Sequence, residues 1–547
     1  MAGESTSTSS RQTISADVVI VGGGFGGCYA LYALRKAGYS VKLIEAGSDF
    51  GGVWHFNSYP GARVDSEVPV YQLSIPEAWR SFQFAERFPG HVELRAYFKH
   101  MAEALDLRKD SVFNARVVKA QIDPSSKRWT LLTDNGIEAT SQYVVFATGT
   151  TNKPYIPSFP GLDSFKGTVL HPCRWPSDLD IKGKKVGIVG QGASGLQILQ
   201  ELAKEDANIT VFVRNPPTAL PMEQRALSAV EAEQQKNHYA LLFTHAKEKD
   251  HSAYTYDAPR GSFHETPPSE REQLWDDLWA RGSYAILSSN FLELSYLKEA
   301  NAEFYKYWAK RVRARISDPR KRDIMAPLEQ FQWIGTKRPN LEMDYYEMID
   351  RPNVELVSLK ENEIRSFTPT GIVTTGASGD EVEHGLDIVI MATGYDSVTG
   401  SLYEMNIEDK NSLRLQEKWA ESIQTYLGMF VPSMPNAFML YGPQAPSGLS
   451  NGPPFLELQV DWIVQFLADI KARGTPNFEV KPDVAVSYVQ RNLAIYSHLL
   501  LKDTPSWWNG SNIPGKNREP LFWVGGLQTW RQETVEALKD LDRFELW

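Results

Sequence analysis

Hydrophobic and polar positions follow the same order in two separate parts of the chain. A short apolar run rich in β-branched residues leads into a glycine cluster, a stretch of helical length and a second apolar run. The first copy has its apolar runs at 16–21 and 41–44, and the second copy has them at 185–189 and 209–213. Uninterrupted apolar runs of this length are typical of buried parallel strands. The pattern therefore predicts an α/β protein with two βαβ units and, with them, two Rossmann-like dinucleotide-binding domains.

Two near-duplicate segments indicate how these domains are connected. Residues 142–150 read QYVVFATGT and residues 387–396 read DIVIMATGYD. Each has the form of a strand that ends in Ala-Thr-Gly, and we expect the pair to mark the two crossings between the domains. The second domain is then inserted into the first. The predicted organisation is a disordered polar tail at 1–14, the first domain at 15–150 and 387–547 with a C-terminal loop, the second domain at 151–221 and 331–386, and a helical insert at 222–330.

The insert breaks the strand–helix alternation and carries a helical pattern. Phe304, Trp308, Val312 and Ile316 recur every four residues, which places them on one face of a helix. The following basic residues form either a phosphate-binding patch or a solvated helix face: Lys310, Arg311, Arg313, Arg315, Arg320, Lys321 and Arg322. We favour the solvated face, because the chain as a whole is acidic.

Composition narrows the class of protein. Of 547 residues, 42% are hydrophobic and 23% are charged, as in soluble globular proteins, and the formal net charge of −10 argues against nucleic acid as a partner. The longest uncharged run, residues 18–34, is short for a membrane span and contains five glycines, so we expect no membrane span. The two cysteines, Cys28 and Cys173, provide neither a CxxC metal site nor a nearby dithiol. This cysteine usage indicates a reducing compartment, and we expect a cytoplasmic protein.

The first glycine cluster has the spacing of a dinucleotide-binding loop. Gly22 allows the tight turn after the strand, Gly24 lets a pyrophosphate approach the backbone, and Gly27 lets the helix pack on the strand. Glu45 ends the second apolar run, where a carboxylate accepts hydrogen bonds from ribose hydroxyls and repels a 2′-phosphate. The first site therefore suits an adenine dinucleotide without a 2′-phosphate.

The second cluster carries the opposite charge. Gly190, Gly192 and Gly195 repeat the spacing, but the residue after the second apolar run is Arg214, whose guanidinium pairs well with a 2′-phosphate. The second site therefore suits NADP. Two such sites without a dithiol indicate a flavoprotein that is reduced by NADPH and does not pass its electrons to a disulfide.

Two further segments carry a resemblance to a known family. Residues 51–72 read GGVWHFNSYPGARVDSEVPVYQ, and residues 165–178 read FKGTVLHPCRWPSD with His171 and a Trp-Pro dipeptide. Both resemble signatures of the type I Baeyer–Villiger monooxygenases. The related flavin N- and S-oxygenases share the Phe, Gly and His but usually lack the Trp-Pro. Ser58 and Ser177 depart from the family pattern at positions with no assigned chemistry. The matching residues of the first segment are Gly52, Trp54, Tyr59, Pro60, Gly61 and Asp65.

The resemblance implies an enzyme that uses FAD, NADPH and O2 to convert ketones to esters or lactones. In this family NADPH reduces the flavin, the reduced flavin adds O2, and an anionic peroxyflavin attacks the ketone. The family's active-site arginine falls on Arg338, and Asp65 is expected to orient it. An arginine suits this task because it stabilises an oxyanion and cannot supply a proton at working pH.

The resemblance also assigns residues around the cofactors and the substrate. Lys337 falls where relatives contact the 2′-phosphate, and Trp507 is the expected NADP contact in a mobile loop at 506–516. Gly52, Trp54, Tyr59 and Tyr71 are expected around the flavin. The substrate-pocket loop falls on Ser447, Gly448 and Leu449, and the small Gly448 is expected to widen the pocket.

Other functions remain open at this stage. A flavin monooxygenase that oxygenates nitrogen or sulfur would not need Arg338. A non-catalytic NADP-binding redox sensor would not turn over, and an NADPH oxidase would release peroxide in proportion to the NADPH consumed. We expect a monomer or a weak homo-oligomer and no metal. His171 either acts in catalysis or fixes the link between the domains, and we favour the second role.

Overall fold

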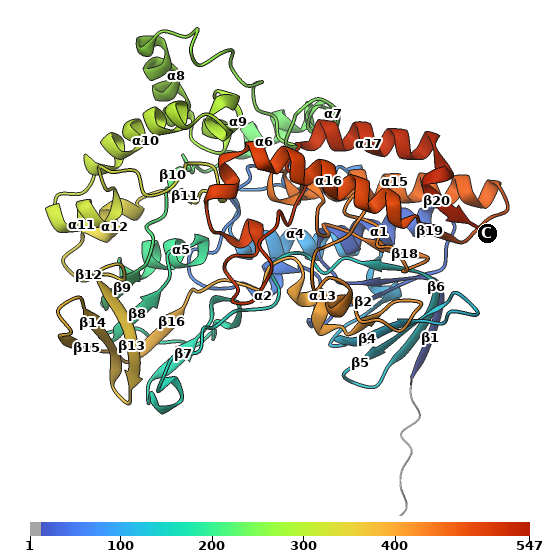
Figure 1. Ribbon diagram of the computed structural model, residues 1–547, viewed down its shortest axis with the longest axis horizontal. Coiled ribbons are helices and arrows are strands. Elements are labelled where there is room, and N and C mark those ends of the chain that lie inside the picture. The colour runs from blue at the N-terminus through green and yellow to red at the C-terminus, as the bar shows by residue number, and fades with distance from the viewer. Residues whose placement is uncertain (1–11) are drawn as a thin grey trace, which may run out of the picture.

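Two β-sheets organise the chain, one in each of two lobes (Figure 1). The computed structural model describes residues 12–547. The first lobe contains an eight-stranded sheet in the order β17-β4-β5-β6-β1-β2-β3, with β18 paired to β6. Its strands are β1 (Thr13–Val21), β2 (Val41–Ile44), β3 (Ser111–Val112), β4 (Val117–Ile122), β5 (Trp129–Thr133), β6 (Glu138–Phe146), β17 (Ile407–Glu408) and β18 (Ala437–Met439).

The predicted first βαβ unit is confirmed. β1 and β2 run parallel, and α1 (Phe25–Lys36) connects them. β1 begins at Thr13, so the sheet takes up the end of the segment predicted as a tail at 1–14, while residues 1–11 of that prediction lie outside the described part of the chain. In Figure 1, α15 (Gly452–Ala472), α16 (Pro482–His498) and α17 (Leu527–Lys539) lie above this sheet.

The second lobe contains a five-stranded parallel sheet in the order β12-β9-β8-β16-β7. The second βαβ unit is formed by β8, α5 and β9, as predicted. A three-stranded antiparallel sheet lies beside it in the same lobe (Figure 1). The elements are α5 (Ala193–Leu202), β7 (Thr168–Leu170), β8 (Lys185–Val189), β9 (Asn208–Val213), β12 (Val354–Ser358), β13 (Asn362–Thr368), β14 (Gly371–Gly376), β15 (Glu381–Gly385) and β16 (Ile388–Met391).

One predicted domain boundary is wrong. Strand β16 was assigned to the first domain because the crossing was placed at residue 387, yet it pairs with β8 and β7 in the second sheet. The chain therefore returns to the first lobe only after Met391. The two Ala-Thr-Gly segments look alike because each follows a central parallel strand of its own sheet, β6 and β16.

The helical insert packs on the second lobe. It contains α6 (Ala229–Lys236), α7 (Tyr239–Glu248), α8 (Pro268–Arg281), α9 (Ala285–Ser288), α10 (Lys298–Arg313) and α11 (Pro319–Met325). The four residues predicted to share a helix face, from Phe304 to Ile316, are all buried, and α10 carries three of them. Lys310, Arg311 and Arg313 form ion pairs with acids of the same insert, which agrees with a solvated face.

Shorter elements complete the chain. They are α2 (Val53–Phe56), α3 (Pro76–Trp79), α4 (His91–Ala104), α12 (Tyr345–Asp350), α13 (Gly400–Glu404), α14 (Leu415–Lys418), β10 (Leu220–Pro221), β11 (Leu341–Glu342), β19 (Phe478–Val480), β20 (Phe544–Leu546) and the 3-10 turns η5 (Pro446–Gly448) and η7 (Trp507–Asn509). Between residues 12 and 547, no helix is both long and apolar enough to cross a membrane.

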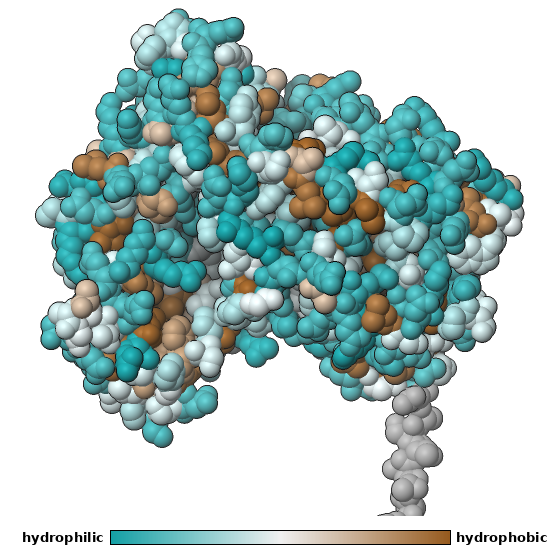
Figure 2. Space-filling model, viewed as in Figure 1, coloured by the Kyte–Doolittle hydropathy of each residue, from teal (hydrophilic) through white to brown (hydrophobic). Residues whose placement is uncertain are grey.

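Separate hydrophobic cores fill the two lobes, and the second core continues into the insert. Figure 2 shows a mostly hydrophilic surface with a notch between the lobes along the lower edge of the view. At the seam, the Tyr59 hydroxyl lies 2.9 Å from Gln197 Oε1 of α5, to which it donates, and Gly61 lies so close to α5 that a Cβ would stand 2.7 Å from the Gln197 carbonyl oxygen. Tyr59, expected at the flavin, therefore packs against the other lobe.

Candidate active site

The first glycine loop is built so that only glycines fit. Gly22 has φ +110°, and a Cβ there would lie 2.5 Å from the Ala147 carbonyl oxygen. A Cβ on Gly27 would lie 1.8 Å from the Gly22 carbonyl oxygen, so the helix could not close on the strand. Gly52, with φ +53°, packs against Gly24, and a Cβ on Gly52 would be 2.9 Å from Gly24 Cα. The loop thus leaves backbone N–H groups at the start of α1 free to face an anion.

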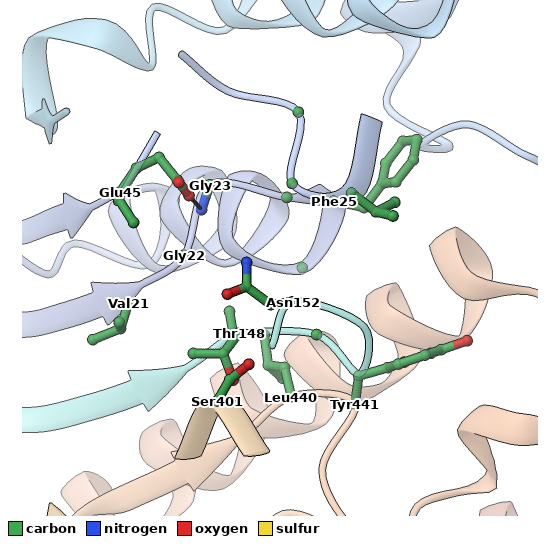
Figure 3. Close-up of a pocket in the computed structure, with 18 of the residues that line it drawn as sticks. Val21, Gly22, Gly23, Phe25, Glu45, Thr148, Asn152, Ser401, Leu440 and Tyr441 are labelled. Carbon is green, nitrogen blue, oxygen red and sulfur yellow. Dashed lines mark hydrogen bonds between the residues drawn. The ribbon is translucent and has the colours of Figure 1, made fainter. Parts of the chain in front are cut away.

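A cavity runs along this loop (Figure 3). At one end the buried Glu45 carboxylate accepts hydrogen bonds from the backbone N–H groups of Gly23 and Gly47, both at 2.5 Å. Its oxygens keep free lone pairs on the cavity wall. At the other end Trp54 Nε1 donates to the Tyr71 hydroxyl at 2.9 Å, and Tyr441 and Pro453 complete the wall. An elongated cavity with an acid at one end, a glycine loop in the middle and aromatic rings at the other fits FAD.

Arg338 and Asp65 form a bidentate ion pair, although 273 residues separate them in the sequence. Arg338 Nε donates to Asp65 Oδ2 at 2.6 Å, and Nη2 donates to Oδ1 at 2.7 Å. The two side chains are 27% and 28% exposed, so part of the guanidinium remains open to a ligand. Burial raises the pKa of the Asp65 carboxyl, but the charge and hydrogen bonds of Arg338 outweigh it and hold that pKa below its usual range.

The guanidinium of Arg338 keeps its positive charge because the Asp65 carboxylate lies beside it. Burial lowers the pKa of Arg338, but the neighbouring Asp65 charge outweighs burial and raises it well above its usual range. Arg338 does not line the cavity itself, but its charge acts on Tyr71 and Tyr441, which do, so the cation lies near the aromatic end. In Tyr441, burial raises the hydroxyl pKa and Arg338 opposes the rise.

The second glycine loop has the same construction with one difference. Gly190 has φ +100°, a Cβ there would lie 2.5 Å from the Ala392 carbonyl oxygen, and a Cβ on Gly195 would lie 2.2 Å from the Gly190 carbonyl oxygen. Around Gly192, by contrast, no described atom lies within 4 Å of a Cβ position. The middle glycine therefore faces open space at the start of α5, where a pyrophosphate fits.

A basic cavity lies beyond the end of β9. Arg214, Arg320 and Lys360 line it together with the acids Asp323 and Glu361, and Lys337 stands beside the cations. Burial, together with the charges of Arg214 and Lys360, lowers the pKa of Lys337 to about 8. Within residues 12–547, no carboxylate forms an ion pair with Arg214, Lys337 or Lys360. Several cations around one cavity, three of them without an ion-pair partner, fit a dianionic phosphate.

Sequence reasoning misses Lys360 and names Arg320 only within a basic run for which a solvated face is favoured over a phosphate-binding patch. A signal for Lys360 was present, since it follows the strand β12 just as Arg214 follows β9, and ligands of parallel sheets bind beyond the carboxyl ends of the strands. Arg320 belongs to the basic run of the insert, most of which is paired with acids, and only the structure singles it out.

The predicted substrate loop joins the aromatic end of the first cavity. The Tyr441 hydroxyl donates to the Ser447 carbonyl oxygen at 2.9 Å. The expectation that Gly448 widens a pocket is wrong in this arrangement, because the ring of Phe522 stands 2.8 Å from the position of a Cβ there. Leu449 packs with Trp507 and Phe522 in a small hydrophobic cluster.

The C-terminal loop reaches the Arg338 segment. Thr504 Oγ1 lies 2.7 Å from Thr336 Oγ1, two residues before the catalytic candidate. Asn512 Nδ2 donates to the Tyr395 carbonyl oxygen at 2.9 Å, and Lys516 Nζ donates to Asp396 Oδ1 at 2.9 Å. Trp507 is partly buried on Trp508, and its contact with NADP stays a prediction.

His171 lies at the connection between the lobes. Its Nε2 donates to the Gly394 carbonyl oxygen at 2.9 Å, and its ring packs edge-on against Tyr395. Burial lowers the pKa of its imidazole, so the ring stays neutral at neutral pH. These contacts agree with a role in linking the two crossing segments.

Comparison with known proteins agrees with this arrangement. Residues 15–220 match the family model described as flavin-binding monooxygenase-like. The chain is 37% identical to the FAD-binding monooxygenase acrE of Aspergillus aculeatus, with 98% of this chain and 90% of that protein covered. It is 35% identical to the cyclopentanone 1,2-monooxygenase of a Comamonas species, with 95% and 94% covered.

Solved structures give the same result. A complex of OTEMO with FAD and NADP matches with a TM-score of 0.91 at 31% identity, and the match covers 98% of this chain and 100% of that chain. The similarity therefore extends across both lobes and the insert.

Proposed function

The chain belongs to the flavin-binding Baeyer–Villiger monooxygenases, and we propose on this basis that it converts ketones to esters or lactones with FAD, NADPH and O2, using Arg338 as its catalytic cation. The observation that supports the role of Arg338 is its bidentate pair with Asp65 at the aromatic end of the first cavity. The alternative of a protein that binds NADP without turnover has no such need for a fixed cation beside the flavin.

Bound FAD supplies the redox chemistry, since it accepts hydride from NADPH and activates O2. The first glycine loop would hold its pyrophosphate and Glu45 its ribose, while Trp54 and Tyr71 would border its ring. The chain then has to stabilise negative charge that develops on oxygen when the carbonyl is attacked. Arg338 provides this stabilisation, and removal of one such group typically costs about 3–4 kcal/mol of transition-state stabilisation.

An arginine at this position also limits the competing release of hydrogen peroxide. A proton delivered to the reacting oxygen diverts it to hydrogen peroxide. Because the pKa of Arg338 is raised well above its usual range, the guanidinium donates hydrogen bonds without releasing a proton. Asp65 holds the planar fork in one orientation through its two carboxylate oxygens.

The second lobe binds NADPH. Gly190, Gly192 and Gly195 receive the pyrophosphate, and Arg214 and Lys337, joined by Lys360, receive the 2′-phosphate. Trp507 closes over the nucleotide from the C-terminal loop. The ketone enters beside Ser447, Gly448 and Leu449, next to Tyr441. We further propose a cytoplasmic location, which the two separated cysteines suggest, and a monomer or weak homo-oligomer.

Product analysis tests this function. The purified holoenzyme is supplied with NADPH, O2 and a panel of linear, cyclic, aromatic and steroidal ketones, and thioethers are tested in parallel. Mass spectrometry should detect a product one oxygen heavier than at least one ketone. Sulfoxides without any ester would instead identify a nitrogen- or sulfur-oxygenating enzyme.

The role of Arg338 is tested with R338A. This variant should still oxidise NADPH and reduce its flavin, but ester formation should fall by about 10²–10³-fold and peroxide should replace the ester. Arg225 forms a surface ion pair with Glu231, so R225A is a matched control that should behave like the parent enzyme. Ester formation by R338A at a rate near that of the parent would refute the assignment.

A further inference from the structure

We propose that Tyr284, carried by the helical insert, is a positioning residue that holds Asp65, and through it Arg338, in the orientation needed for oxygen insertion. This inference rests on the proposed role of Arg338. It also gives the insert a part in the reaction, because Tyr284 belongs to the insert and its hydroxyl donates to Asp65.

Tyr284 contacts both members of the pair. Its hydroxyl donates to Asp65 Oδ2 at 2.7 Å, the same oxygen that accepts from Arg338 Nε at 2.6 Å. The Pro339 carbonyl oxygen lies 2.9 Å from the same hydroxyl. The face of its ring lies under the guanidinium, with Arg338 Cζ 4.9 Å from the ring centroid. One side chain thus fixes the carboxylate from one side and supports the cation by a cation–π contact.

The third donor matters because the ion pair alone leaves a degree of freedom. A guanidinium and a carboxylate held by two parallel hydrogen bonds can swing together as a flat unit. A third donor, the Tyr284 hydroxyl on Oδ2, restricts this swing. Tyr284 is buried, and burial raises the pKa of its hydroxyl well above its usual range, so it remains a donor at any working pH.

Contacts of Ser283 and Tyr254 fix the position of Tyr284. Ser283, just before it, adopts a left-handed φ of +65°, and its N–H donates to the Pro221 carbonyl oxygen at 3.0 Å. Tyr254 packs edge-on against Tyr284, and its hydroxyl lies 2.9 Å from Oγ of Ser66, the neighbour of Asp65. The insert therefore holds the Asp65 loop at two adjacent positions.

The test uses two Tyr→Phe variants of the holoenzyme. Y284F keeps the ring and removes the hydroxyl. Y307F is the matched control, because Tyr307 also lies in the insert and its hydroxyl also donates to a carboxylate at 2.7 Å, that of Asp276. Y284F should reduce its flavin with NADPH at the parental rate, while ester formed per NADPH falls about tenfold and peroxide rises in its place. Y307F should show neither change.

The pH profile separates positioning from general weakening. The Tyr284 hydrogen bond contributes to the lowered pKa of Asp65, so its loss raises that pKa, and ester yield should fall at a higher pH on the acidic side in Y284F. The other ionisable groups that act on or face Asp65 are Arg338, Tyr59, Tyr71, Tyr254 and Tyr441. Both variants retain all of these groups.

Three outcomes would overturn the proposal: a parental ester yield in Y284F, an equal loss in Y307F, or a full further loss when Y284F is added to D65N. The last would mean that Tyr284 does not act through Asp65. Failure of the proposed function is distinguished by R338A, since ester formation in that variant would remove the role of Arg338 whatever Y284F does.

Discussion

Lys337 is a partly buried lysine whose charge has opposite effects on stability and on cofactor binding, and K337M separates the two. Its pKa is lowered from 10.5 to about 8, first by burial and then by the charges of Arg214 and Lys360. At 1.36 kcal/mol for each unit of pKa, keeping this side chain protonated in the folded chain at pH 7 costs about 3 kcal/mol.

The sign follows from proton linkage. The unfolded chain binds the proton of Lys337 more tightly than the folded, NADP-free chain does, so the cost is present in full below about pH 8 and disappears as the pH rises towards 10.5. K337M removes the cost. The free energy of unfolding of the NADP-free protein should therefore rise at pH 7 by up to about 3 kcal/mol, with a smaller gain at pH 9.5.

NADPH binding should respond in the opposite direction. Binding of the 2′-phosphate favours the protonated form of Lys337. The affinity of the parent enzyme for NADPH should therefore fall up to about tenfold for each pH unit above 8. K337M should bind NADPH about 10–100-fold more weakly at pH 7 and lose most of this pH dependence. NADH, which lacks the 2′-phosphate, should be affected little in either protein.

Thermal unfolding at pH 7 and 9.5, with KM for NADPH and NADH over the same range, measures both effects. Lys306 is exposed, so K306M serves as the control and should change neither quantity. A K337M protein that is less stable than the parent at pH 7 would refute the reasoning. So would a parental NADPH affinity that is constant from pH 7 to 9.5.

Two glycine substitutions give further predictions. G27A should yield a protein without its yellow colour, because the added Cβ would lie 1.8 Å from the Gly22 carbonyl oxygen and the FAD loop could not close; a normal flavin content after purification would contradict this. G192A should change stability by less than about 0.5 kcal/mol, since its Cβ meets no described atom within 4 Å, yet raise KM for NADPH several-fold by intruding on the pyrophosphate. An unchanged KM would show that the phosphates lie elsewhere.

Local pattern was sufficient for the two βαβ units. The strands at 41–44 and 185–189 lie where the apolar runs placed them, because buried parallel strands and glycine turns are encoded by neighbouring residues. The boundary near residue 387 was misplaced for the opposite reason. Which sheet accepts β16 depends on its pairing with β8, about 200 residues away, and no local pattern reports that pairing.

The residues of the candidate site also divide into those that the sequence predicts and those that it misses. The pairing of Asp65 with Arg338 was suggested by family resemblance, and neither residue stands out from its local sequence. Tyr284 is missed because it belongs to no motif and approaches the ion pair only through the packing of the insert. Lys360 is missed although its position after β12 is a signal in the sequence, because the pairing of β12 with β9 brings it to the basic cavity. Gly448 was misread because a small residue can mark either empty space or, as here, an aromatic ring from a distant segment.

The ion pair between Asp65 and Arg338 joins side chains whose neighbours belong to different cores, since Val64 packs in the first lobe, and Ile334 and Leu341 pack in the second. If one lobe tilts against the other, Asp65 and Arg338 either move together or separate. Separation would move the positive charge away from the aromatic end of the first cavity. If Arg338 is the catalytic cation, a change at the seam that separates the pair should lower the ratio of ester to peroxide. The ratio of ester to peroxide would then report on the position of one lobe relative to the other.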